Sequence, residues 1–260
     1  MEYRLSTNGE GFDPKAKQLK EIQRRIIDLR LKNDSSLWVQ YAHELANILE
    51  FQDPKHPYPS IANPLYMRER RDCVIGNVYR LLCVNEPDSC GMFTVVRQEW
   101  ATYAGDLFDV DPKSLLDQFR QDVRNEMRGD NVGWLFAAIE ASFDPKTNCY
   151  QFHIHGVATD RHRAAIDKLR KRKAYQPWEG IPGIPDCKRP ILITRQPLTN
   201  LPSALGYILK PFWKLRGPGP GVRLPPQEHV RALLWLHRQR LQRITLMMGL
   251  SVRNGQILEK

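Results

Sequence analysis

The sequence has few of the features that mark secreted or membrane-bound proteins. Its 260 residues include five cysteines, an odd number without a Cys-x-x-Cys pair, which argues against a disulfide scaffold and favours reduced thiols. No stretch approaches the length of a membrane span, and residues 1–15 contain no apolar core of a signal peptide. The sequence also contains no internal repeats. We therefore expect a cytoplasmic protein without membrane contact.

The charge balance is strongly basic. The chain has 39 Lys+Arg against 29 Asp+Glu, a formal net charge of +10. Such a surface favours a polyanionic partner and salt-dependent binding, although many basic proteins have no such partner, so charge alone does not identify a nucleic acid. A hydrophobic content of 42% is typical of a folded globular protein and excludes a disordered chain.

A β-hairpin is predicted between residues 134 and 157, with Asp144 to Asn148 as its turn. Alternate residues of a strand share a face, so His153 and His155 point the same way. If the hairpin closes symmetrically about the peptide bond between residues 146 and 147, Glu140 lies opposite His153 and diagonal to His155. A slip of one residue would turn this carboxylate to the other face.

These three side chains form a candidate metal site. Two imidazoles and one carboxylate suit Mg²⁺ or Mn²⁺ when water or phosphate oxygen completes the coordination. Such a site supports Lewis-acid catalysis on a phosphate. A His-x-His pair on a strand is often incidental, so the hypothesis depends on Glu140 and on a second motif.

The second motif contains Tyr207 and Lys210, in the segment GYILKPFWK. Asn200 or Ser203 is expected to cap a short helix, which places Tyr207, Lys210 and Lys214 on one face. A tyrosine hydroxyl titrates near pH 10, so as a nucleophile it needs a metal or a nearby cation, and Lys210 is the candidate cation. Taken alone, this motif equally fits a partly buried tyrosine beside a surface lysine.

Together, GWLFAAIEASFDPKTNCYQFHIHGVA and GYILKPFWK resemble two motifs of the HUH endonucleases, most closely the single-tyrosine rolling-circle replication initiators of bacterial plasmids. The resemblance implies that His153, His155 and Glu140 hold a divalent metal. It implies that Tyr207 attacks a phosphate of single-stranded DNA, with Lys210 in support, and leaves a 5′-phosphotyrosine and a free 3′-hydroxyl.

The resemblance extends from Met92 to Lys214, about half of the chain. Residues 92–96 match the family's threonine-rich first motif only loosely. Pro211 lacks a backbone N–H and biases the residue before it away from helical dihedrals, so the tyrosine helix is expected to kink or end just past the nucleophile.

The expected fold class is α+β. A central, mainly antiparallel sheet of the HUH or RRM-like kind has helices on one face, and its ligand face stays open. We assign residues 1–64 to a helical extension with a proline-rich linker, 65–216 to the nuclease domain, and 217–260 to a linker and a helix.

Five elements set this expectation. Helices are predicted over 14–32, 35–50, 111–127 and 226–248, and a first strand over 92–98. The expected core-facing residues of the first two helices are Leu19, Ile22, Ile26, Leu29, Leu37, Tyr41, Leu45 and Leu49.

Several basic residues are candidates for DNA contact. A helix is predicted over 161–173, and its last turn contains Arg170, Lys171, Arg172 and Lys173. Cations there either complement the helix C-terminus or hold the DNA backbone, and Lys214 is a further candidate. Arginines near residues 68–80 line either a DNA groove or a solvated helix face. Tyr175 and Trp178 offer either stacking surfaces for bases or the packing of a loop.

These observations favour a metal-dependent, site-specific DNA endonuclease and strand transferase. Expected partners are single-stranded DNA or an origin hairpin, with a host helicase and polymerase, and a dimer remains open. Alternatives are a relaxase or single-strand transposase with the same chemistry, a catalytically silent DNA-binding protein, and an unrelated metal hydrolase or phosphoesterase.

Overall fold

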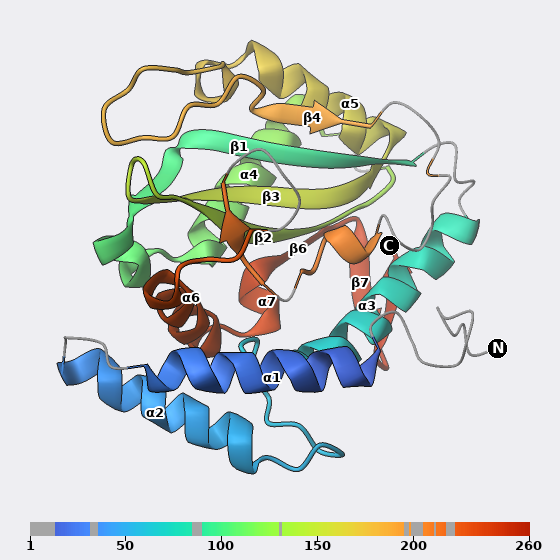
Figure 1. Cartoon of the computed structure of the whole chain (residues 1–260). Coiled ribbons are helices and arrows are strands. Elements are labelled where there is room, and N and C mark those ends of the chain that lie inside the picture. Colours follow the sequence, from blue (N-terminus) through green and yellow to red (C-terminus); the bar gives the residue numbers. More distant parts are fainter. Residues whose placement is uncertain are drawn as a thin grey trace.

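A single mainly antiparallel sheet lies at the centre of the molecule (Figure 1). The computed structural model describes residues 14–31, 36–84, 90–129, 132–194, 198, 205–210, 212–216 and 222–260. The described strands of this sheet run in the order β4-β1-β3-β2-β5, and β6 also pairs with β2. All of these pairings are antiparallel except β2 with β5. The predicted α+β class is therefore confirmed.

The sheet is built from β1 (Cys90–Tyr103), β2 (Leu135–Asp144), β3 (Cys149–Thr159), β4 (Ile191–Ile193), β5 (Lys214–Leu215) and β6 (Thr245–Met248). The first strand is longer than the predicted 92–98, and its pairing with β3 shifts register between Val96 and Ala101. Between the pairs Val96–His153 and Ala101–Gln151, β1 has four residues where β3 has one.

The central hairpin forms as the sequence predicts. The carboxylate of Asp144 accepts a hydrogen bond from the backbone N–H of Lys146 at 2.9 Å, and Asn148 adopts the left-handed backbone conformation, with φ 54°. Both are turn-forming roles of these residue types. The turn pairs Asp144 with Cys149, and the ladder that follows brings Glu140 opposite His153.

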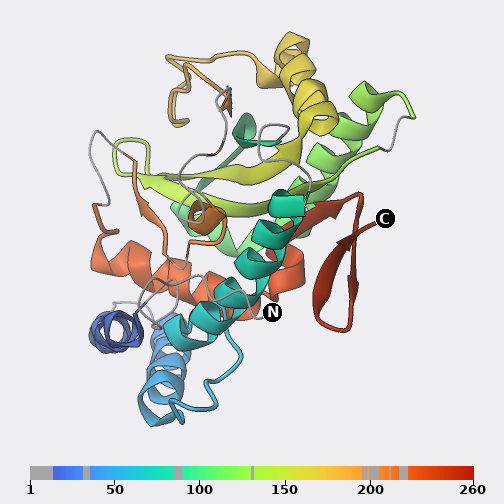
Figure 2. The ribbon, with the colours of Figure 1, turned by 90° about the vertical axis from the view of Figure 1, so that its right-hand side faces the viewer.

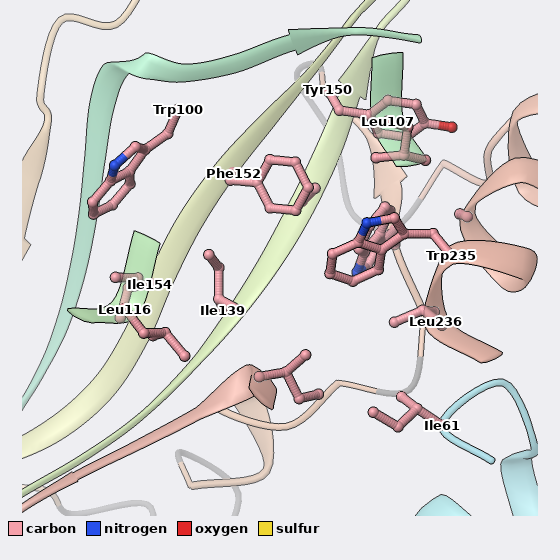
Figure 3. Close-up of a cluster of buried hydrophobic side chains, with 14 of the residues drawn as sticks. Ile61, Trp100, Leu107, Leu116, Ile139, Tyr150, Phe152, Ile154, Trp235 and Leu236 are labelled. Carbon is pink, nitrogen blue, oxygen red and sulfur yellow. The ribbon is translucent and has the colours of Figure 1, made fainter. Parts of the chain in front are cut away.

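Alternate residues of the hairpin point to opposite faces of the sheet and belong to two different hydrophobic cores. Odd-numbered residues of β2 from Leu135 to Phe143 join the larger core, as do Phe152 and Ile154 of β3. That core also takes buried residues from η2 (Ala104–Asp109), α1 (Lys15–Arg30), α2 (Ser36–Phe51), α4 (Pro112–Met127), α5 (Asp160–Lys168) and α6 (Pro226–Arg238). Figure 3 shows Phe152 and Trp235 facing each other within it; their ring centroids are 5.6 Å apart.

The other face of the sheet is apolar at one end and polar at the other. Trp134, Phe136 and Ala138 pack in a second core, whereas Glu140 and Ser142 follow on the same face of β2. The second core is completed by α3 (Pro64–Val84), by residues around η5 (Leu205–Tyr207), and by the hairpin of β7 (Leu250–Arg253) and β8 (Gln256–Glu259). Figure 2 shows this hairpin in dark red beside α3. The expectation that helices cover one face of the sheet and leave the other open is therefore wrong at the apolar end, where α3 and the β7-β8 hairpin pack on it.

The C-terminal prediction was wrong beyond residue 238. The expected helix over 226–248 is α6, followed by the short α7 (Leu241–Ile244) and then by β6. Gln239 and Arg240 have extended backbones, and β6 pairs with the outer edge of β2. Ile244 and Met248, whose spacing suggested that the helix continues, are instead buried in α7 and β6.

The two N-terminal helices form much as expected. They lie side by side, at the end of the molecule away from α5 and β4 (Figure 1). Ile22, Ile26, Leu29, Leu45 and Leu49 are buried, as predicted. Leu19 and Tyr41 are instead exposed, because each lies at the margin of its apolar stripe; the side chain of Leu37 lies outside the described residues.

The remaining predicted elements are α4, capped by Asp111, and α5. The α-helix α5 ends at Lys168 and not at residue 173 as predicted, because two 3₁₀ turns, η3 (Leu169–Lys171) and η4 (Lys173–Tyr175), follow it. Among the described helices, none combines the length and the apolar character that a membrane span requires.

Candidate metal centre and nucleophile

Glu140, His153 and His155 converge at the polar end of the ligand face. The Oε1 atom of Glu140 lies 2.8 Å from Nε2 of His153 and 2.8 Å from Nε2 of His155. All three side chains are buried. The register that the sequence predicted for Glu140 is thus the one observed.

Each imidazole has a partner on its other nitrogen. Nδ1 of His153 donates to the carbonyl oxygen of Gln151 at 3.2 Å, and Nδ1 of His155 lies 2.7 Å from the hydroxyl of Thr94. Outer contacts of this kind fix the orientation of a ligating histidine. They leave both Nε2 atoms directed at the same point.

The donor set fits a divalent cation. A carbonyl oxygen only accepts, so Nδ1 of His153 carries a proton, and Nε2, which points at the carboxylate, is the nitrogen that would bind a metal. The other oxygen of Glu140, Oε2, is buried without a hydrogen-bond partner among the described residues. Ligands at right angles around a cation about 2.1 Å away are about 3.0 Å apart, close to the observed 2.8 Å.

The charge states of these groups also suit metal binding. Burial alone would raise the pKa of Glu140, but hydrogen bonds with His153 and His155 outweigh it and hold this pKa well below its usual range. Burial lowers the pKa of His155, against the raising effect of Glu140. An ionised carboxylate and a neutral imidazole are the forms that bind a metal. Within the described part of the chain, no other group of three or more His, Cys, Asp or Glu residues has this convergence.

Tyr207 lies beside this cluster. Its ring packs edge-on against His155, with centroids 5.5 Å apart, and the ammonium of Lys210 lies 3.0 Å from the centre of the tyrosine ring. The ammonium also contacts Oε1 of Glu140 at 3.2 Å. Interaction with Lys210 lowers the pKa of the Tyr207 hydroxyl, against the partial burial that would raise it. The sequence-predicted ligands, nucleophile and lysine therefore meet in one place.

The local structure around Tyr207 differs from the prediction. Tyr207 ends the short 3₁₀ helix η5, Lys210 lies beyond it in an irregular segment, and Lys214 belongs to β5, so the three do not share a helix face. The helical turn ends at Tyr207, as expected from Pro211, and Leu205, Ile208 and Leu209 are buried in the second core. The proposed caps Asn200 and Ser203 lie outside the described residues.

An arginine that the sequence analysis left open supports this turn. Arg71 of α3 is buried and donates a hydrogen bond to the carbonyl oxygen of Gly206 at 3.0 Å. Burial lowers the pKa of this guanidinium to about 10. Arg71 therefore fixes the backbone next to the tyrosine, a role that no local sequence signal indicated.

A cavity of about 190 Å³ joins these groups. Beside the predicted residues, its lining contains side chains that the sequence analysis did not select: Thr94, Val96, Ser142, Gln151, Cys187 and Arg216. Ser142 and Gln151 could have been found by continuing the strand alternation two residues beyond Glu140 and His153. Lys214 lines the same cavity.

The basic tract after α5 is not brought to this cavity. Leu169 within it belongs to the larger core, on the other side of the sheet from Glu140, His153 and His155. Arg172 pairs with Asp122 and Glu126, each at 2.7 Å, and Arg170 pairs with Asp167 at 2.7 Å, whereas Lys171 and Lys173 are exposed.

The aromatic residues of the following loop are packed. Tyr175 and Trp178 are both buried, and the Tyr175 hydroxyl donates to Asp122 at 2.7 Å. Because both rings are buried, they offer no stacking surface to a base. Of the two hypotheses for these aromatic residues, packing of the loop is therefore confirmed.

Comparisons with known proteins add no family to these observations. No family model, no curated protein and no solved structure matches the chain.

Proposed function

We propose that this protein is a metal-dependent enzyme that nicks and rejoins single-stranded DNA, and that it initiates rolling-circle replication. The observation that supports the proposal most directly is the position of Tyr207, against His155 of a buried Glu-His-His cluster and under the ammonium of Lys210. A nucleophile with a lowered pKa beside a candidate metal site is the arrangement that phosphoryl transfer to tyrosine requires.

The reaction follows from the groups present. The phenolic oxygen of Tyr207 loses its proton and attacks phosphorus in line, while the bond from phosphorus to the 3′-oxygen breaks. The leaving 3′-oxygen takes up a proton, so the products are a 5′-phosphotyrosine and a free 3′-hydroxyl. Because the phosphotyrosine bond conserves the energy of the broken phosphodiester, the reverse attack by a 3′-hydroxyl rejoins the strand.

The chain's own residues divide this work. Glu140, His153 and His155 would hold Mg²⁺ or Mn²⁺, which supplies charge withdrawal from the phosphate oxygens when bound. Thr94 and the carbonyl of Gln151 orient the two imidazoles. Lys210 stabilises the tyrosine anion, since its ammonium already lowers the pKa of that hydroxyl.

The test is formation of a covalent adduct. Wild-type protein is incubated with pooled, labelled single-stranded origin DNA and Mn²⁺, then analysed by denaturing gel and peptide mass spectrometry. We expect an adduct on the Tyr207 peptide that is lost with EDTA, in Tyr207→Phe and in His153→Ala. Tyr41→Phe is a matched control, because Tyr41 is 49% exposed and Tyr207 48% exposed.

The opposite result has a defined meaning. Tight DNA binding without an adduct or a nick, with any metal or origin candidate, would favour a catalytically silent DNA-binding protein. A relaxase or a single-strand transposase would give the same adduct, and would differ in the DNA element that it cleaves.

A further inference from the structure

The cavity beside the metal ligands has a second end that the nicking reaction does not use. It is lined by Val96, Ser142, Gln151, Cys187, Lys214 and Arg216, which we call the Gln151 end. Ser142 pairs with Gln151 across the hairpin and with Lys214 across to β5, so these residues form the next row of the sheet after Glu140 and His153. The whole cavity, about 190 Å³, is several times the ~30 Å³ that one water occupies in the liquid.

Gln151 has a free acceptor in this row. Its side chain is 2% exposed, and its Nε2 donates to the carbonyl oxygens of Arg97 at 2.9 Å and of Phe152 at 3.3 Å. Both carbonyl oxygens can only accept hydrogen bonds, so the amide group cannot be flipped. Nε2 therefore faces them, and Oε1 is the atom without a partner. This oxygen is buried without a hydrogen-bond partner among the described residues. A buried acceptor of this kind is costly unless a ligand donates to it.

Two cationic side chains, Lys214 and Arg216, line the Gln151 end. No carboxylate among the described residues pairs with Lys214, which is half-buried at the cavity wall. Arg216 is also half-buried, and it is held by a backbone hydrogen bond to Phe143 at 2.7 Å and by its guanidinium on the carbonyl of Asp186. A cavity lined both by two cations and by neutral hydrogen-bonding groups suits a nucleotide, with its phosphate at the cations and its base at the neutral groups.

The direction of the in-line attack by Tyr207 indicates which nucleotide would occupy the Gln151 end. Tyr207 lies against His155, and the row of Gln151 lies beyond His153, four residues along β3 from His155. In an in-line displacement the leaving oxygen departs on the side opposite the nucleophile. The nucleoside whose 3′-oxygen leaves is therefore directed away from Tyr207, toward the Gln151 end.

We propose that the Gln151 end is a base-selecting subsite, which holds the nucleotide on the 5′ side of the nick and favours a base with an exocyclic amino group. The amino group of adenine, cytosine or guanine donates to Oε1 of Gln151. A base without that group leaves the buried oxygen unpaired and is bound more weakly. The inference rests on the proposed nicking function, because the orientation of the DNA comes from it.

The experiment compares bases that differ only in the amino group. Full-length Tyr207→Phe protein, which cannot form the adduct, is titrated with Mn²⁺ and labelled single-stranded dodecamers in which every third nucleotide carries the test base and the others are thymidine, so that no dodecamer is self-complementary. The three pairs are adenine with purine, cytosine with pyrimidin-2-one, and guanine with hypoxanthine. Binding is followed by fluorescence anisotropy at one fixed salt concentration, since the phosphate contacts respond to salt.

For at least one pair we expect roughly tenfold tighter binding of the amino-bearing oligonucleotide, the range of one buried hydrogen bond. Adding Gln151→Leu should bring that ratio to within about twofold, whereas adding Lys214→Met should weaken all six oligonucleotides and keep the ratio. Ratios within about twofold for all three pairs in protein that retains Gln151 would overturn the proposal. That comparison needs no further variant, so it stands even if Gln151→Leu does not fold.

The outcome is separable from that of the nicking proposal. A base preference in the titration, combined with no adduct on Tyr207 in wild-type protein, would keep a base-selecting site at the Gln151 end and overturn both the nicking reaction and the assignment of this site to the 5′ side of a nick. An adduct combined with no base preference would keep the nicking reaction and overturn the subsite.

Discussion

The ammonium of Lys210 lies 3.2 Å from Oε1 of Glu140, the same oxygen that both imidazoles of the cluster contact. A lysine and a divalent cation would therefore share one carboxylate oxygen. Two positive charges at such a short distance repel each other, so the binding of one affects the position of the other.

Lys210→Met should therefore bind Mn²⁺ more tightly than the wild type. We expect roughly a tenfold gain in Mn²⁺ affinity. Two unit charges about 4 Å apart repel each other by ~4 kcal/mol at an effective dielectric constant of about 20, and the wild-type lysine avoids part of this repulsion because its side chain can rotate away. Isothermal titration calorimetry measures the affinity. Lys214→Met is the matched control and should change it less. Equal or weaker binding by Lys210→Met would show that the two cations do not compete for Glu140.

Glu140→Gln should abolish the effect of metal on stability. Wild-type protein should gain about 2.7 kcal/mol at a Mn²⁺ concentration 100 times the dissociation constant, visible as a higher melting temperature. The amide cannot replace an anionic ligand, so the variant should lose at least roughly 100-fold in affinity. Ser142→Ala, on the same face of β2 two residues away, should keep the stabilisation. A melting temperature of Glu140→Gln that still rises with Mn²⁺ would contradict the ligand assignment.

Gly156→Ala should destabilise the fold and disturb the site. A β-carbon at this position would lie 2.4 Å from the ring of Phe93 and 2.6 Å from the carbonyl oxygen of Phe136. The carbonyl belongs to the sheet and cannot move freely, so we expect a loss of roughly 1–3 kcal/mol in urea unfolding. Because residue 156 adjoins His155, Mn²⁺ affinity should fall as well. Gly105→Ala, where the added atom has no neighbour within 4 Å, should cost little.

His162 should make the protein less stable in mild acid. It is buried in α5, and burial lowers its pKa to about 4, whereas an unfolded histidine titrates near 6.5. Its contribution to stability is fully present above pH 6.5 and is lost as the pH falls toward 4, because only the unfolded chain binds the proton in that window.

The change between pH 7.5 and pH 5 isolates this histidine. Wild-type protein should lose about 2 kcal/mol more over that interval than His162→Leu, measured by urea unfolding at each pH. His43→Leu, a substitution of an exposed histidine, should behave like the wild type. Identical losses in wild type and His162→Leu would place the acid sensitivity elsewhere.

The metal cluster could be predicted because its determinants are local. The turn residues Asp144 and Asn148 fix the hairpin register, and that register alone brings Glu140 opposite His153. Strand alternation then decides the face. No contact from a distant segment is needed, so reading two neighbouring strands was sufficient.

The surroundings of Tyr207 could not be predicted in the same way. The backbone there depends on Arg71, which lies 135 residues before its partner Gly206, and on burial of Leu205, Ile208 and Leu209 in the second core with α3. The C-terminal segment shows the same limit, since the spacing of Leu241, Ile244 and Met248 suits a helix locally, and only the free edge of β2 selects a strand. Pairing partners remote in sequence leave no local pattern.

Tyr207 is an exposed residue between buried neighbours, with Leu205 and Gly206 before it and Ile208 and Leu209 after it. Its backbone is therefore ordered when the protein folds. If Tyr207 is the nucleophile that we propose, the conformational entropy of fixing it is lost during folding, and a substrate phosphate would meet an already oriented hydroxyl. The second core would then contribute to the reaction rate as well as to the stability of the protein.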